Sequence, residues 1–139
     1  MVSIKKVLVV DDEPGIRRLL ADVLSSSTCH VVMACDGLEA VTILKRRRFD
    51  AVVTDINMPG MDGIELLRWM KANRRKEPVV VMSGSPDHEV LPGRGLSPVA
   101  ARFRKPFRLP VFMETMTTLL DTERRGSRSR LKAKRKGVA

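Results

Sequence analysis

The sequence predicts an α/β protein built around a parallel β-sheet. Short apolar runs alternate with amphipathic segments, and successive runs begin about 20 to 28 residues apart, which is the rhythm of strands joined by crossover helices. The runs are continuously apolar instead of alternating, as expected of strands that helices cover on both faces. At 139 residues the chain fits one domain with a hydrophobic core of its own.

Five of these runs are the predicted strands. They are short, and the first four are rich in β-branched residues, which favours strands over helices. Met58-Pro59-Gly60 follows the central run and is a turn sequence, in which Pro sets φ and Gly tolerates positive φ. Asp55 is therefore expected where a strand meets a loop. The predicted strands span residues 7–10, 31–34, 51–54, 79–82 and 99–104.

Four segments carry apolar residues at helical spacing. Pro14 suits the first turn of the first helix, Asp36 and Asp62 each precede a Gly that opens the next two, and the last helix contains residues 111–120. The predicted apolar faces include Leu19, Leu38 and Val111, whereas Arg17 is expected to face solvent. Residues 84–98 contain several Pro and Gly, so at most a short fourth helix is expected near residues 87–91.

Polar residues follow the predicted strands at their carboxyl ends. Asp11 and Asp12 follow the first strand, Asp55 the third, and Ser83 closes the fourth. Lys105 follows the fifth strand. The carboxyl ends of parallel strands meet at one edge of a sheet, which is where α/β proteins bind ligands. We therefore expect these five side chains to gather at a single site.

The three carboxylates at this edge repel one another unless a cation intervenes. Mg²⁺ is a hard cation that takes oxygen ligands and needs only one or two carboxylates beside a phosphate oxygen. Asp55 can then act as a carboxylate nucleophile that accepts a phosphoryl group. The Lys105 ammonium can offset the charge of that group, and the Ser83 hydroxyl can donate to one of its oxygens.

Four motifs together carry a family resemblance. Residues 7–14, 55–63, 82–84 and 105–107 resemble, in order and spacing, the receiver domain of two-component response regulators. The resemblance covers roughly residues 4–122. It implies a flavodoxin-like (βα)₅ doubly wound sheet with strand order 2-1-3-4-5, in which the fourth helix of this chain would be short or irregular.

The resemblance also implies roles at the site. Asp55 would accept the phosphoryl group from a histidine kinase, a phosphotransferase or a small phosphodonor. Mg²⁺ would bind Asp12, Asp55 and the backbone carbonyl of Asn57 directly, and Asp11 through water. Ser83 and Lys105 would hold the phosphoryl group, and the Lys105–Pro106 peptide bond would be cis.

One position departs from the family pattern. Receivers often carry an aromatic residue three positions before the lysine, and Arg102 stands there in this chain. Phe103 is adjacent, but a step of one residue along a strand points a side chain to the opposite face of the sheet. Phe103 is therefore expected to be a poor substitute.

The positive charge is concentrated at the end of the sequence. The formal net charge is +10, yet residues 124–139 hold eight Lys and Arg and no acid, which leaves 18 basic and 16 acidic residues in the rest. We expect a receiver domain over residues 1–123 and a basic, disordered tail over residues 124–139. Cys29 and Cys35 form no disulfide framework, and no signal peptide or membrane span is found, which favours the cytoplasm.

These observations predict a phosphorelay signalling module and not a turnover enzyme, beyond slow self-catalysed phosphorylation and dephosphorylation. Its partners would be a sensor histidine kinase or phosphotransferase and a downstream protein target. A metal-dependent hydrolase would need a substrate pocket and a further general base, and the sequence offers neither. A third hypothesis is a degenerate receiver that acts as an interaction module, with the basic tail contacting a polyanion such as nucleic acid. Apart from such a contact through the tail, nucleic acid is not an expected partner.

Overall fold

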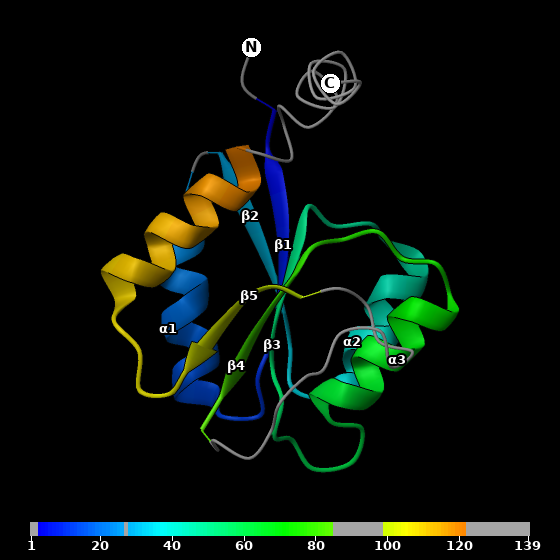
Figure 1. Cartoon of the computed structure of the whole chain (residues 1–139). Coiled ribbons are helices and arrows are strands. Elements are labelled where there is room, and N and C mark those ends of the chain that lie inside the picture. The colour runs from blue at the N-terminus through cyan, green and yellow to red at the C-terminus, as the bar shows by residue number, and fades with distance from the viewer. Residues whose placement is uncertain (1–2, 27, 85–98, 122–139) are drawn as a thin grey trace, which may run out of the picture.

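The computed structural model describes residues 3–26, 28–84 and 99–121 (Figure 1). The predicted irregular fourth helix and the predicted tail lie outside these residues. The strands are β1 (Lys5–Val10), β2 (Cys29–Ala34), β3 (Ala51–Asp55), β4 (Val79–Ser83) and β5 (Val99–Arg104). The helices are α1 (Pro14–Leu24), α2 (Gly37–Arg46), α3 (Gly63–Ala72) and a last helix over residues 109–121.

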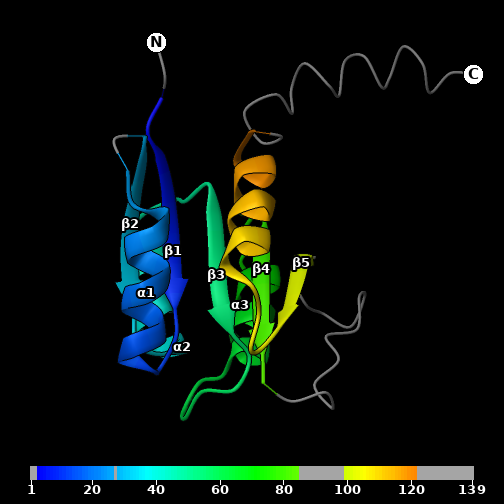
Figure 2. The same cartoon turned by 90° about the vertical axis from the view of Figure 1, so that its left-hand side faces the viewer.

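The five strands form one parallel sheet in the order β2-β1-β3-β4-β5. Figure 2 shows them side by side in this order, with α1 and the helix over residues 109–121 in front. The observed order confirms the predicted 2-1-3-4-5 topology. Val10 pairs with both Ala34 and Thr54, so β1, β2 and β3 end at nearly the same level.

Helices cover both faces of the sheet (Figure 1): α2 and α3 lie on one face, and α1 and the helix over residues 109–121 lie on the other. Alternate residues of the central strands pack on opposite faces of the sheet. Leu8 and Val52 pack in the core under α2 and α3, whereas Val7, Val9 and Val53 pack under α1. All five side chains are fully buried, which explains why these strands read as continuous apolar runs.

Three predictions of core-facing residues were wrong. Leu19 is 42% exposed, Leu38 63% and Val111 46%. In two of the three cases a neighbour in the chain is buried instead: Leu20 beside Leu19 and Phe112 beside Val111 are both fully buried. Helical spacing defines an apolar face only to within one residue, and packing against the strands decides which residue of a pair is covered.

Aspartate side chains cap the two helices, α2 and α3, that begin at the carboxyl edge of the sheet. Asp36 Oδ1 accepts a hydrogen bond of 2.8 Å from the Glu39 N–H at the start of α2. Asp62 Oδ1 accepts one of 2.9 Å from the Glu65 N–H at the start of α3. Each cap satisfies an N–H group that has no partner within its helix. None of the described helices is long and apolar enough to cross a membrane.

A buried ion pair joins the end of α2 to the loop before β4. The Arg75 guanidinium donates to both carboxylate oxygens of Glu77 and to the backbone carbonyls of Leu44 and Arg47. The Phe49 N–H also donates to Glu77, at 3.2 Å. Burial is the largest single influence and raises the pKa of Glu77, but the hydrogen bonds from Arg75, the backbone hydrogen bonds and the Arg75 charge together outweigh it, so the pKa lies below its usual value.

We expect Arg75→Ala to lower the free energy of unfolding by about 3 kcal/mol near pH 7, because it leaves Glu77 as a buried charge without its cation. Urea denaturation of the two proteins measures the difference. Lys71→Ala is the matched control, since Lys71 is exposed and its loss should change stability by less than about 0.5 kcal/mol.

The Arg75–Glu77 pair also determines how the free energy of unfolding depends on pH. Because the pKa of Glu77 is lowered in the folded state, its contribution to stability is present above its unfolded pKa of about 4.3 and is lost as the pH falls through the folded value. The difference between wild type and Arg75→Ala should therefore shrink on acidification. A difference that does not change with pH would contradict this account.

Gly63 lies where α3 approaches the end of β3. Its N–H donates to the carbonyl of Ile56 at 2.9 Å, and a Cβ at this position would collide with the Asp55 carbonyl oxygen and lie 2.8 Å from the Ile56 Cα. Both neighbours are backbone atoms, which cannot move without displacing β3.

We therefore expect Gly63→Ala to destabilise the protein by about 1 to 3 kcal/mol in chemical denaturation. Gly15→Ala is the matched control within α1. A Cβ on Gly15 meets nothing within 4 Å, so that variant should be more stable than wild type by up to about 1 kcal/mol. Equal midpoints for the two variants would show that the close approach at Gly63 is unimportant.

Candidate functional site

The carboxyl edge of the sheet brings together residues that are far apart in the sequence. Asp11 follows β1, Asp55 ends β3 and Lys105 follows β5. Backbone hydrogen bonds fix the ends of these strands: the Asp11 N–H donates to the Ala34 carbonyl at 3.2 Å, and the Lys105 N–H donates to the Ser83 carbonyl at 2.7 Å. Each functional side chain therefore starts from a backbone position that the sheet holds.

Three carboxylates meet at this edge. Asp11, Asp12 and Asp55 each offer an oxygen atom, and the three atoms lie within 4.8 Å of one another. Asp11 is fully buried and Asp55 is 4% exposed, whereas Asp12 is half-buried. Buried carboxylates that lose water need compensating charge or hydrogen bonds. The predicted acidic cluster is confirmed, and its donor set consists of the oxygen ligands that Mg²⁺ prefers.

Lys105 supplies part of this compensation. Its Nζ lies 3.1 Å from Asp11 Oδ2 and 3.0 Å from Asp55 Oδ2, and 3.8 Å from the exposed Glu13 Oε1. Burial is the largest single influence and lowers the pKa of Lys105, but the hydrogen bonds to Asp55 and Asp11 and the charges of these two carboxylates together outweigh it and raise the pKa above its usual value. The ammonium therefore stays charged, and it faces the carboxylates of Asp11, Asp55 and Glu13.

Asp55 is held at both carboxylate oxygens. Oδ2 accepts from Lys105, and Oδ1 accepts a hydrogen bond of 3.2 Å from the Asn57 N–H. Burial raises the pKa of Asp55, and the opposing effect of Lys105 is the smaller of the two. Gly60, in the loop after β3, has a positive φ of 73°, as the turn sequence Met58-Pro59-Gly60 predicted.

Two further predictions concern the ends of β4 and β5. Ser83 ends β4 and is half-buried, beside the Lys105 backbone that donates to its carbonyl. The Lys105–Pro106 peptide bond is cis, which confirms the expectation. The roles of the Ser83 hydroxyl and the Asn57 carbonyl stay predictions.

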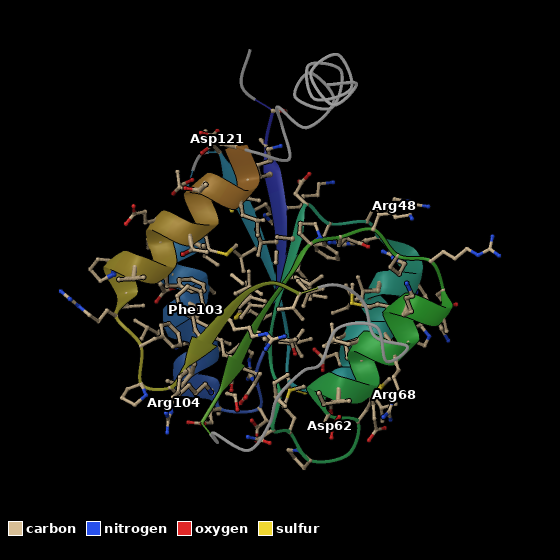
Figure 3. All side chains as sticks on the ribbon, viewed as in Figure 1. Arg48, Asp62, Arg68, Phe103, Arg104 and Asp121 are labelled. Carbon is tan, nitrogen blue, oxygen red and sulfur yellow. The ribbon has the colours of Figure 1, made fainter. Side chains whose placement is uncertain are left out.

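Phe103 points away from the site, as expected. The pairing of β4 with β5 places Arg102 opposite Val81 and Phe103 opposite Met82. The Phe103 ring packs 5.4 Å from Phe107 and 5.5 Å from Phe112 between centroids, in the core under α1 and the helix over residues 109–121 (Figure 3). Arg102 is exposed and belongs to the other face.

Two residues contribute to the site that the sequence did not predict there. Arg17 was expected to face solvent, but it is half-buried and its Nη1 donates to the Asp11 carbonyl at 2.7 Å. Glu13 reaches toward Lys105, and its N–H donates to Asp11 Oδ1 at 2.9 Å. The available signal was position, because both residues lie within about two turns of the acidic pair in the chain.

Comparisons with known proteins agree with this geometry. The family model of the response regulator receiver domain matches residues 7–117. Sporulation initiation phosphotransferase F of Bacillus subtilis is 35% identical over 103 residues, which cover 74% of this chain and 83% of that protein. Chemotaxis protein CheY-3 of Vibrio cholerae is 33% identical over 119 residues, covering 84% and 92%.

Solved structures agree as well. The receiver domain of the Francisella response regulator 1452 superposes with a TM-score of 0.73 at 26% identity, covering 84% of this chain and 97% of that one. CheY4 of Vibrio cholerae gives a TM-score of 0.71 at 27% identity, covering 84% and 99%. The chain belongs to the family of response regulator receiver domains.

Proposed function

We propose that this protein works in a phosphorelay and that Asp55 is the residue that accepts the phosphoryl group. The observation that carries the proposal is the contact of one Asp55 oxygen with the Lys105 ammonium, at 3.0 Å, beside two further carboxylates. An isolated surface aspartate would have neither the burial nor the cation. Similarity to sporulation initiation phosphotransferase F and to part of the sensor histidine kinase RcsC of Escherichia coli supports a partner of one of these kinds.

The transfer uses a carboxylate as nucleophile. An Asp55 oxygen attacks the phosphorus atom, a P–O bond forms, and the P–N bond to the donor histidine breaks, with its electron pair leaving on the imidazole nitrogen. The Lys105 ammonium offsets the negative charge on the transferring oxygens. The Asn57 N–H orients the carboxylate through its 3.2 Å hydrogen bond to Oδ1. The reaction leaves an acyl phosphate on the protein, so the chain is a phosphoacceptor and not a turnover enzyme.

A divalent cation would balance the negative charge of Asp11, Asp12 and Asp55 that Lys105 alone does not offset. Asp12 and Asp55, with the backbone carbonyl of Asn57, would hold Mg²⁺, and Asp11 would act through water. The fit rests on the three carboxylate oxygens within 4.8 Å, since oxygen donors in an acidic cluster suit a hard cation. When bound, the ion supplies positive charge that stabilises the phosphoryl oxygens during transfer.

The output would be a change in a protein-binding surface. Phosphorylation adds a charge of about −1.5 to −2 at Asp55, which competes for the Lys105 ammonium that now binds Asp11 and Asp55. Lys105 follows β5 directly, so a change in its contacts is transmitted to this edge strand and to the surface around it. A downstream protein that reads this surface would complete the pathway.

Acetyl phosphate with Mg²⁺ should add one phosphoryl group to the protein, and Asp55→Asn should abolish the adduct because an amide is a poor nucleophile. Intact-mass spectrometry measures both. Asp62→Asn is the matched control, since Asp62 caps α3 at the same edge and lies outside the acidic cluster. A wild-type protein that stays unmodified, or an adduct that survives Asp55→Asn, would refute the proposal.

Mg²⁺ should raise the melting temperature, because binding to the folded state alone stabilises it by mass action. Asp12→Asn should weaken the apparent affinity in a thermal-shift titration, since it removes one charged ligand from the cluster. Asp36→Asn serves as control: it removes one acid from the cap of α2 and leaves the cluster intact. Equal Mg²⁺ responses in wild type and Asp12→Asn would exclude Asp12 as a ligand.

A further inference from the structure

Exposed positive charge gathers at the amino edge of the sheet, opposite the acidic site. We call this surface the basic edge. It consists of seven exposed residues at and beyond the ends of α2 and α3: Lys45, Arg46, Arg47, Arg48, Lys71, Arg74 and Lys76. In Figure 3, Arg48 lies at this edge and Asp62 at the opposite one.

The helix dipole accounts for only part of this surface. Cations in the last turn of a helix are favourable, and α2 has two there, Lys45 and Arg46, whereas α3 has one, Lys71. The other four residues lie beyond the last helical residue. Neither the dipole nor the caps of these helices require Arg47, Arg48, Arg74 or Lys76 to be basic.

Arg75 brings the two basic segments together. Its Nη2 donates to the Arg47 carbonyl at 2.8 Å, and its Nη1 donates to the Leu44 carbonyl. Lys71, Arg74 and Lys76 line one hollow together with Arg75. The charges after α2 and those after α3 therefore form one surface and not two separate helix ends.

The nearby acids are already engaged. Glu77 is buried and binds Arg75 and the Phe49 N–H, and Asp50 accepts a hydrogen bond of 2.8 Å from the Lys6 N–H. Within the part of the chain that the structure describes, none of the seven residues forms an ion pair with a carboxylate. The surface thus presents uncompensated charge to solvent.

The basic C-terminal sequence is attached at the same edge. The described part of the last helix reaches Asp121, and Asp121 and Lys5, at the start of β1, line one hollow. Eight Lys and Arg follow within residues 124–139. Asp121, the last residue that the structure describes before them, lies at the amino edge and not at the phosphoryl site.

We infer that the basic edge binds the phosphate backbone of duplex nucleic acid. Four of its seven residues are arginines, whose guanidinium groups match phosphate oxygens in a bidentate way. Binding to a membrane surface also buries an apolar face, and among the exposed large apolar residues of the described chain only Ile4, just before β1, lies at the amino edge. Every aromatic residue that the structure describes is buried or half-buried, so contacts to the phosphates should dominate over base stacking and carry no sequence preference.

Fluorescence anisotropy of the full chain with a labelled duplex DNA of about 20 base pairs, over a series of salt concentrations, tests the inference. The edge variant carries Arg46→Gln, Arg48→Gln and Lys76→Gln. The control variant carries Arg18→Gln, Arg68→Gln and Arg104→Gln, which are exposed elsewhere. A tail variant carries Arg128→Gln, Arg130→Gln and Lys132→Gln. Each removes three charges from the net +10.

The edge variant should reduce the slope of log K against log salt concentration by about 2 to 3, roughly one unit for each DNA phosphate that the protein no longer neutralises. The control variant should change the slope by less than about one unit. Arg46→Lys with Arg48→Lys should keep the slope, which separates the removal of charge from a folding defect. Asp55→Asn should keep it too, because the inference does not rest on phosphorylation.

Three results would overturn the inference. Equal slopes for the edge and control variants would mean that only net charge matters. A slope that decreases in the tail variant but not in the edge variant would assign binding to residues 124–139. Retention on phosphatidylserine vesicles without duplex binding would identify a lipid surface as the partner.

Discussion

The contact of the Lys105 ammonium with Asp11 and Asp55 is the interaction on which the site depends. It joins the ends of β1, β3 and β5 across the carboxyl edge of the sheet, at 3.1 and 3.0 Å. Without it, the buried carboxylates of Asp11 and Asp55 would lose the one cation that forms a salt bridge with them among the residues that the structure describes. In the proposed function, the same ammonium would meet an incoming phosphoryl oxygen, so the contact that stabilises the resting site would also prepare it for transfer.

The direction of the helices divides the molecule into two chemically different edges. Crossover helices run back against parallel strands, so their starts lie at the carboxyl edge and their ends at the amino edge. Asp36 and Asp62 cap the starts of α2 and α3, and basic residues follow their ends. A metal and phosphoryl site at one edge and an anion-binding surface at the other would each use the charge that the topology already favours.

The chain departs from common receivers in how the aromatic residues are used. Phe103, Phe107 and Phe112 pack against one another under α1 and the helix over residues 109–121, and Arg102 occupies the exposed face of β5. A rotating aromatic side chain therefore has no place at residue 102. In the proposed function, a signal that leaves Asp55 through β5 would therefore pass through Lys105 and not through an aromatic side chain at residue 102.

The sequence alone determined the strands, the helix starts and the residues at the strand ends, because apolar periodicity and turn chemistry are local properties. Only the tertiary structure decided which of Leu19 and Leu20 is buried, and that Arg17 turns inward to bind the Asp11 carbonyl. It also paired Arg75 with the end of α2, about 30 residues away in sequence. These outcomes depend on strand register and helix packing, which join distant residues and leave no local pattern in the chain.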